Sequence, residues 1–243
     1  MQPKDRIIVA LDVDNAFRAI QLVGMLRDHV GVFKVGLELL TATGAEIFDK
    51  LRDAGAERIF YDAKLHDIPN TVAGAMRGVV RRGAWCVTVH TTGGSEMLRA
   101  AVETARQEAT VAGVERPLVL GVTLLTSIGS QVLREELWSS IPVEDYVVSL
   151  AKMARESGCD GVIASPQEIL LLRRAIPDRK FLIITPGVRP VGSEAGDQVR
   201  VMTPANAIRN GASYLVIGRP IVAAPSPVAA AEKIAAEIAE AMH

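Results

Sequence analysis

Residues 58–71 read Arg-Ile-Phe-Tyr-Asp-Ala-Lys-Leu-His-Asp-Ile-Pro-Asn-Thr, an apolar run that leads into three charged side chains. If this run is a β-strand, alternation places Asp62 and Lys64 on one face, a carboxylate beside an ammonium. Asp67 precedes Ile68-Pro69 and is well placed to cap the next helix, with proline in its first turn. Taken alone, the stretch fits an exposed salt bridge and a helix cap. The rest of the chain favours a functional site.

Short apolar runs that predict strands alternate along the chain with amphipathic segments that predict helices. The eight predicted strands are residues 6–11, 32–37, 58–64, 85–90, 117–124, 161–165, 181–185 and 214–218. The predicted helices are 15–29, 68–82, 95–110, 143–157, 166–175, 203–210 and 226–242, with 41–54 filling the remaining gap.

Strands that alternate with helices pair in parallel, and eight such units in 243 residues suit a closed barrel. An open doubly wound sheet is the alternative, but it normally has a glycine-rich first turn, and none follows Leu11. We therefore predict an α/β protein with a (β/α)8 TIM-barrel fold, as a single domain spanning residues 1–243.

Two predicted helices carry apolar side chains at helical spacing, which we expect to be buried. These side chains are Phe17, Ile20, Val23 and Leu26 in 15–29, and Val72, Met76 and Val79 in 68–82.

The composition excludes several classes of protein. With 27 basic and 28 acidic residues the net charge is −1, which argues against a general binder of nucleic acid or membrane surfaces. No apolar run approaches the roughly 18 residues of a membrane span, and the N-terminus shows no signal-peptide pattern. Cys86 and Cys159 form no C-x-x-C pair and have apolar or small neighbours, so we expect buried free thiols. These features favour a cytoplasmic protein.

If the chain forms a barrel, the chemistry belongs at the C-terminal ends of the strands. Polar residues recur there, and we expect no comparable set of polar residues at the opposite end of the barrel. The residues at these ends are Asp12, Lys34, Asp62, Lys64, His90, Thr123 to Ser127, Ser165, Pro186 to Arg189, and Gly218-Arg219. His66 and His90 could donate hydrogen bonds near the site, although a lone histidine is more often structural.

The charged cluster indicates an acid rather than a nucleophile. A Schiff-base lysine needs a lowered pKa, whereas a carboxylate beside Lys64 favours the charged ammonium. Alternating Lys34, Asp62, Lys64 and Asp67 would form an array in place before substrate arrives. Asp62 and Asp67 could bind a metal, but the lysine between them disfavours a dication.

Two further segments suit an anionic ligand. Gly218-Arg219 would let backbone N–H groups approach a phosphate while the arginine supplies a bidentate fork. The segment 186–198 is long, rich in glycine and proline, and contains Arg189 and Gln198. It is typical either of a lid that closes over ligand or of a long surface loop.

The motif Asp62-Ala-Lys64-Leu-His-Asp67 resembles the D-x-K-x-x-D signature of the orotidine 5′-phosphate decarboxylase family. The resemblance covers the whole chain, and further motifs follow in the family's order. They are Leu-Asp12, Phe-Lys34-Val-Gly, Val-Thr-Leu-Leu-Thr126-Ser, Thr-Pro186-Gly-Val-Arg189-Pro and Ile-Gly218-Arg219-Pro-Ile.

The resemblance implies a decarboxylase of UMP biosynthesis that uses no metal or organic cofactor. Its catalytic residues would be Lys64, Asp62, Asp67 and Lys34, with Lys64 as the proton donor to C6. The enzyme would be a homodimer whose sites lie at the subunit interface, so that Asp67, Ile68 and Thr71 enter the partner's site. The implied substrate contacts are Asp12 and Lys34 to the ribose, Thr126 to the pyrimidine, Arg189, Gly218 and Arg219 to the phosphate, Gln198 to phosphate and base, and Pro186 before the lid.

Two alternatives remain open at this point. A sugar-phosphate enzyme of the same superfamily shares the signature but uses Mg²⁺, and such relatives typically carry a metal-binding glutamate at the position of Lys34. A catalytically silent barrel that only binds a nucleotide or acts as a scaffold is the second. A complete array of charges is hard to explain in a catalytically silent protein, because it costs desolvation free energy.

Overall fold

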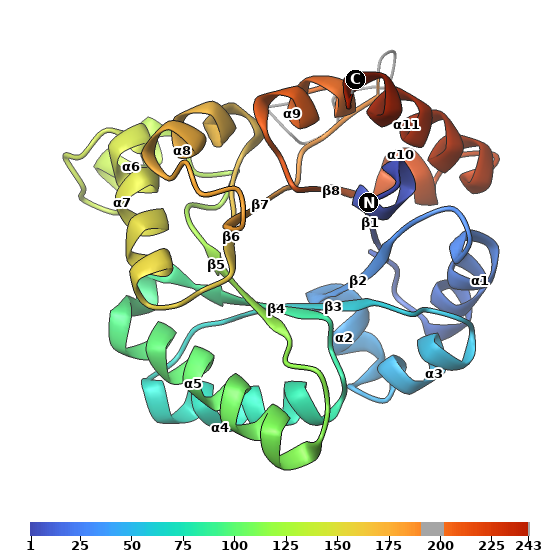
Figure 1. Ribbon diagram of the computed structural model, residues 1–243, viewed down its shortest axis with the longest axis horizontal. Coiled ribbons are helices and arrows are strands. Elements are labelled where there is room, and N and C mark those ends of the chain that lie inside the picture. The colour runs from blue at the N-terminus through green and yellow to red at the C-terminus, as the bar shows by residue number, and fades with distance from the viewer. Residues whose placement is uncertain (191–201, 243) are drawn as a thin grey trace.

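The computed structural model describes residues 1–190 and 202–242, in which eight parallel strands close into a barrel in the order of the chain (Figure 1). The strands are β1 (Ile7–Ala10), β2 (Val32–Gly36), β3 (Ile59–Leu65), β4 (Cys86–His90), β5 (Leu118–Val122), β6 (Gly161–Ile163), β7 (Leu182–Thr185) and β8 (Tyr214–Ile217). All eight predicted strands are confirmed, and the predicted barrel with them.

Alternation along each strand divides the apolar side chains between two layers. On β1, Ile7 and Val9 pack outward in the main core beneath the helices, and Ile8 points into the barrel interior. The interior layer consists of Ile8, Val32, Phe60, Cys86, Leu120, Ile184 and Tyr214. The interior of the barrel is therefore filled by side chains, and the two cavities described below lie at its ends.

Both cysteines are buried free thiols, as the sequence predicts. Burial raises the pKa of Cys86, and burial together with Asp160 raises the pKa of Cys159 to about 12. Neither thiol is a reactive thiolate near neutral pH.

Helices surround the ring of strands (Figure 1). They are α1 (Ala16–Leu26), α2 (Leu37–Thr43), α3 (Ile47–Asp53), α4 (Pro69–Arg81), α5 (Gly94–Ala112), α6 (Ser130–Glu135), α7 (Val143–Glu156), α8 (Ile169–Ala175), α9 (Pro204–Asn210), α10 (Arg219–Val222) and α11 (Pro227–Ala241). Short 3₁₀ helices are η1 (Pro3–Arg6), η2 (Thr91–Gly93) and η3 (Pro166–Glu168).

The predicted apolar face of α4 is confirmed, because Val72, Met76 and Val79 are buried. The face predicted for α1 is partly wrong: Phe17 is 71% exposed and Ile20 is only half-buried. The buried side chains are Ala19, Leu22, Val23 and Leu26. This set also has helical spacing, and the helix packs its smaller Ala19 on the barrel and leaves the phenyl ring outside.

The segment 41–54 forms parts of two helices rather than one. The backbone of Gly44 has φ 70° and terminates α2, after which α3 begins at Ile47. Two short helices, α6 and α10, were not predicted, because four to six residues carry too little periodicity to be recognised.

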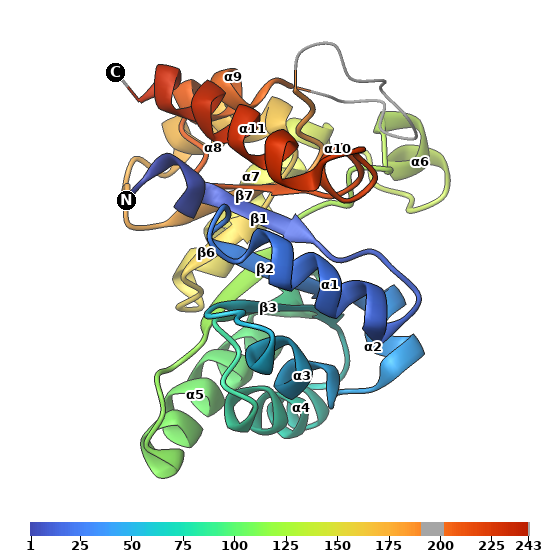
Figure 2. The same ribbon diagram turned by 90° about the vertical axis from the view of Figure 1, so that its right-hand side faces the viewer.

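Figure 2 shows the strand β1 pointing toward the end of the barrel that carries α6, while both termini lie toward the opposite end. At that opposite end lies a cavity of about 410 Å³, lined in part by Arg6, Arg173 and Arg179. The expectation that this end lacks comparable polar side chains is therefore wrong. The arginines come from η1, α8 and the loop after α8, and only the closed barrel brings them together.

Within the described part of the chain, no helix has the length and apolar character needed to span a membrane.

Candidate active site

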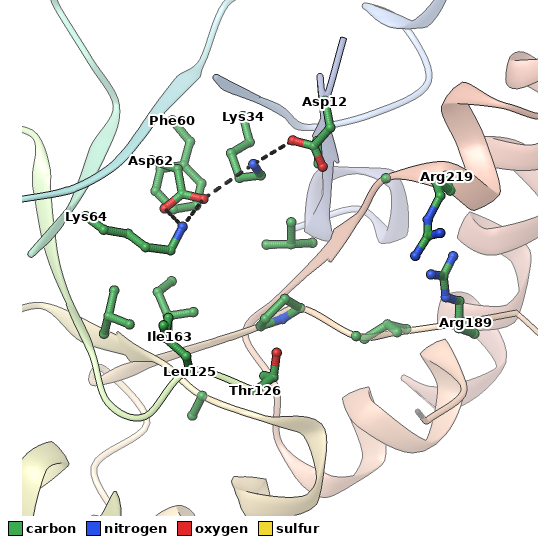
Figure 3. A pocket seen from close by; sticks show the side chains of 18 of the residues that line it. Asp12, Lys34, Phe60, Asp62, Lys64, Leu125, Thr126, Ile163, Arg189 and Arg219 are labelled. Atoms are coloured by element: carbon green, nitrogen blue, oxygen red, sulfur yellow. Dashed lines mark hydrogen bonds and ion pairs between the residues drawn. The ribbon is translucent and has the colours of Figure 1, made fainter. Parts of the chain in front are cut away.

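A cavity of about 290 Å³ opens at the C-terminal ends of the strands (Figure 3). Strands β1, β2, β3, β5, β7 and β8, or the loops that follow them, each contribute a predicted site residue to its lining. These residues are Asp12, Lys34, Asp62, Lys64, Thr126, Pro186, Arg189, Gly218 and Arg219. The parallel topology brings these side chains together, because every strand ends at the same face.

Four charged side chains form a continuous chain along one side of the cavity (Figure 3). The Nζ of Lys34 lies 3.1 Å from Oδ1 of Asp12 and 3.4 Å from Oδ2 of Asp62. The Nζ of Lys64 donates to both oxygens of Asp62, at 3.0 and 3.1 Å. Asp62 and Lys34 are each only 8% exposed. Positive and negative charges alternate, so the buried groups neutralise one another.

This pairing keeps the inner groups ionised despite their burial. Burial lowers the pKa of Lys34, but the carboxylates of Asp62 and Asp12 outweigh it, and the pKa is raised overall. Burial raises the pKa of Asp62, but the charges of Lys34 and Lys64 and hydrogen bonds from Lys64 and Thr88 outweigh it, so the pKa is lowered. The site is thus charged before any ligand binds.

The backbone of β3 changes conformation where it presents Lys64. Lys64 has φ 51°, in the left-handed region, which costs a residue with a side chain about 1–3 kcal/mol. The pairing of β3 with β4 shifts register between Tyr61 and Leu65. Simple alternation predicts that Asp62 and Lys64 share a face, and they do meet, but through this irregular strand end rather than through a regular strand.

The other side of the cavity carries a different chemistry. Arg189 follows β7, Arg219 follows β8, and their guanidinium groups face one another across from the lysines (Figure 3). Thr126 projects from the loop after β5, between these two charged regions (Figure 3). Apolar side chains complete the wall. Leu124, Leu125 and Val188 fall within the predicted strand-end segments, whereas sequence reasoning did not select Phe60, Val122, Ile163, Ala164 and Val216.

Asp67, Ile68 and Thr71 are exposed and do not line this cavity. The prediction that Asp67 caps α4 is wrong, because the N-cap residue is Ile68, with no side-chain cap, and Asp67 accepts a hydrogen bond from the Ile68 N–H, which lies outside the helix. The prediction of proline in the first turn is confirmed by Pro69. Gln198 lies outside the described residues.

Two residues of the site were missed. Gly36 follows Lys34 by two positions on β2, and a Cβ there would lie 2.7 Å from Nζ of Lys34. The motif Phe-Lys34-Val-Gly contained this signal, because residues i and i+2 of a strand share a face. Thr88 hydrogen-bonds to Asp62 from β4, and no local pattern identifies it, since the contact joins residues far apart in sequence.

The two histidines that the sequence places near the site lie beside the cavity rather than in its lining. His66 and His90 lie against one another, with ring centroids 5.1 Å apart, and neither lines the cavity. Burial, then the charges of His66 and Lys64, lower the pKa of His90 against the opposing effect of Asp62. Among residues 1–190 and 202–242 there is no group of three or more His, Cys, Asp or Glu side chains arranged to hold a metal ion.

Comparison with known proteins agrees with this geometry. A relative from Moorella thermoacetica named orotidine 5′-phosphate decarboxylase is 52% identical over 238 residues, covering 98% of this chain and 94% of its own. A second of that name, from Heliobacterium modesticaldum, is 48% identical over 242 residues, covering 100% of this chain and 99% of its own. The crystal structure of orotidine 5′-phosphate decarboxylase from Lactobacillus acidophilus superposes with a TM-score of 0.82 at 40% identity, covering 96% of this chain and 98% of that chain. The model of the "Orotidine 5′-phosphate decarboxylase / HUMPS family" matches residues 5–234. The chain therefore belongs to the orotidine 5′-phosphate decarboxylase / HUMPS family.

Proposed function

We propose that this protein is an orotidine 5′-phosphate decarboxylase, which converts orotidine 5′-phosphate to UMP and CO₂ in pyrimidine biosynthesis. The observation that carries the proposal is the alternating chain Asp12, Lys34, Asp62 and Lys64, facing the arginines at the other side of one cavity. Such a cavity suits a ligand with a phosphate at one end and a reacting carboxylate at the other. The two relatives that share 52% and 48% of their aligned residues with this chain bear this name, and the matches cover 94% and 99% of their own lengths.

The binding roles follow from the chemistry of each wall. Arg189 and Arg219 would bind the phosphate, with the backbone at Gly218 close to it, because a guanidinium forms paired hydrogen bonds with phosphate oxygens. Asp12 and Lys34 would bind the ribose hydroxyls, and Thr126 the pyrimidine. Pro186 would contact substrate at the start of the segment that contains Gln198, which we assign to phosphate and base.

The chemical step requires a proton donor at C6. When the bond from C6 to the carboxylate carbon breaks, CO₂ leaves and its electron pair remains on C6 as a carbanion. The Lys64 ammonium would stabilise that charge as it develops and then transfer a proton to C6, after which the neutral amine regains a proton from solvent. Asp62 keeps Lys64 in place and, facing the substrate carboxylate, would favour its departure.

Lys34 distinguishes this proposal from a Mg²⁺-dependent sugar-phosphate enzyme of the same family. Its ammonium is within 3.4 Å of both Asp12 and Asp62, the carboxylates that a metal at this position would need. A cationic side chain there repels a dication. We therefore propose a reaction without metal or organic cofactor.

We further propose a cytoplasmic homodimer in which the whole chain, residues 1–243, forms one domain. Asp67, Ile68 and Thr71 are exposed at the start of α4, and Ile68 is 67% exposed, as expected of side chains that a second copy covers. They would complete the partner's site, which makes Asp67 catalytic although it lies outside the cavity of its own chain.

The test is the fall in absorbance as orotidine 5′-phosphate becomes UMP, measured with purified protein treated with EDTA. We expect turnover that survives the chelator and is lost in Asp67→Ala. Turnover that appears only with Mg²⁺ and a sugar phosphate would contradict the proposal, and folded protein without turnover would favour the silent barrel.

Mixing Asp67→Ala with Lys64→Ala tests the shared site. A dimer with one copy of each carries one intact site, so random exchange between subunits should restore about a quarter of the wild-type activity. No recovery, under conditions where exchange of labelled wild-type subunits is observed, would contradict the shared site alone.

A further inference from the structure

Thr88 of β4 connects the two residues to which the chemistry is assigned. Its Oγ1 donates to Oδ1 of Asp62 at 2.9 Å and accepts from the backbone N–H of Lys64 at 3.0 Å. The residue is fully buried and is not among those that line the cavity. It therefore acts on Asp62 and Lys64 from behind, without contacting a ligand.

The pairing of β3 with β4 explains why a side chain is needed at this place. Tyr61 pairs with Val87 and Leu65 pairs with Val89, so that residues 62–64 lie opposite Thr88 alone. A bulge of this kind disrupts the hydrogen-bond ladder and aims side chains in new directions. The Thr88 hydroxyl supplies the acceptor that the Lys64 N–H would otherwise find in the ladder.

A hydroxyl suits this position because it donates and accepts a hydrogen bond at the same time. The donated proton goes to an ionised carboxylate, which makes a stronger bond than one between neutral groups. With one oxygen of Asp62 held by Thr88, both oxygens remain oriented toward the Lys64 ammonium. Valine has the same shape without this capacity, and serine keeps the capacity with a smaller side chain.

We propose that Thr88 is a positioning residue, whose hydroxyl fixes the Asp62 carboxylate and the left-handed backbone of Lys64 so that the ammonium enters the cavity in the reactive orientation. This inference rests on the proposed decarboxylase function and adds to it a residue outside the cavity. It assigns a catalytic consequence to a side chain that never touches substrate.

The experiment compares Thr88→Val with Thr88→Ser and with Thr91→Val as a matched control. Thr91 is equally buried, and it donates its hydroxyl proton to the carbonyl of Val122 on β5 rather than to Asp62. Thr88→Val should lower kcat by about tenfold to a hundredfold while the affinity for UMP changes little, because it removes hydrogen bonds to a charged group and to the backbone that presents it. Thr88→Ser should restore most of kcat, and Thr91→Val should keep it.

A titration readout separates positioning from a general loss of structure. Burial raises the pKa of Asp62, while Lys34, Lys64 and the hydrogen bond from Thr88 lower it. Thr88→Val should therefore raise the pKa of the Asp62 carboxyl, measured by ¹³C NMR, and speed hydrogen exchange at the Lys64 amide. Neither change is expected in Thr91→Val.

The outcomes distinguish this inference from the proposed function. One outcome is that the wild type turns over substrate while Thr88→Val shows the same kcat and the same pKa of Asp62. That result would overturn the role of Thr88 and leave the proposed decarboxylase function intact. If wild-type protein shows no turnover, the proposed function fails, and the catalytic consequence assigned to Thr88 fails with it. The NMR and exchange measurements then still decide whether Thr88 fixes Asp62 and Lys64.

Discussion

The two ends of the barrel both gather cationic side chains, but those side chains bind different partners. At the C-terminal end, Lys34 and Lys64 bind the carboxylates of Asp12 and Asp62. At the N-terminal end, Arg173 donates to the carbonyls of Gly211, Phe181 and Asp178 and to the hydroxyl of Ser213, and Arg6 donates to the carbonyls of Ala212 and Ser213.

This difference separates function from stability. Cations that hold backbone carbonyls connect segments of the chain, so their loss should weaken the fold. Cations that hold only carboxylates at a cavity connect side chains, so their loss should change the chemistry first. The same contrast between the two faces is general among barrels of this architecture.

The largest effect is expected for Lys64→Ala at the C-terminal end. Decarboxylation should fall roughly 10⁴-fold or more, because both the proton donor and the charge beside C6 are lost. The midpoint of urea unfolding should change little, since Asp62 keeps Lys34 as a partner. The measurement is steady-state kinetics. The control variant is Lys152→Ala, which removes an exposed lysine on α7. Near-native turnover in folded Lys64→Ala would show that its role is assigned wrongly.

Arg173→Met should produce the opposite result. The free energy of unfolding should fall by about 2–4 kcal/mol, because methionine keeps the aliphatic volume but leaves several hydrogen-bond acceptors without this donor. The kcat of the folded fraction should stay close to that of wild type. Arg174→Met, at the exposed neighbouring position, should leave both quantities unchanged in urea unfolding and turnover assays. A selective loss of kcat in Arg173→Met would break the contrast between the two ends.

Gly36→Ala probes the geometry of the charged chain without removing a charge. The new Cβ would lie 2.7 Å from Nζ of Lys34 and 3.3 Å from Oδ1 of Asp12, so the flexible lysine must shift from its present position. We expect kcat/KM to fall about tenfold with little change in stability, because small displacements within a preorganised site slow the reaction. Gly24→Ala in α1, where nothing lies within 4 Å of the added methyl group, is the matched control. Equal kinetics in the two variants would mean that the position of Lys34 is not critical.

The smallest effect is the dependence of stability on acid pH. The folded-state pKa of Asp62 lies below the ordinary value of 3.8, so its stabilisation is complete above that value and is lost as the pH falls through the folded-state pKa. Urea unfolding of the wild type should therefore lose more free energy on acidification below about pH 4 than that of Asp62→Asn. Arginines do not titrate in this range, so the unfolding free energy of Arg173→Met should depend on pH in the same way as that of the wild type. Parallel profiles for wild type and Asp62→Asn would contradict the lowered pKa.

Much of this protein is encoded locally and could be predicted. Each strand and each long helix is recognisable from its own apolar period, and eight alternating units allow essentially one closed arrangement. The residues at the strand ends then converge without further information, which is why Asp12, Lys34, Asp62 and Lys64 were identified together. A short motif with this spacing also sufficed to indicate the family.

Only the tertiary structure decided which segments distant in sequence contact one another. Thr88 meets Asp62 because β3 and β4 slip in register, and the strand pattern of neither segment encodes that slip. Phe17 was assigned to the core because helical spacing defines a face, but which face packs depends on the barrel beneath it. At the N-terminal end, Arg6 and Arg173 line the same cavity although more than 160 residues separate them in the sequence. A local sequence pattern carries no information about a contact of this kind. Periodicity is a property of neighbouring residues, whereas register and packing are properties of the closed barrel.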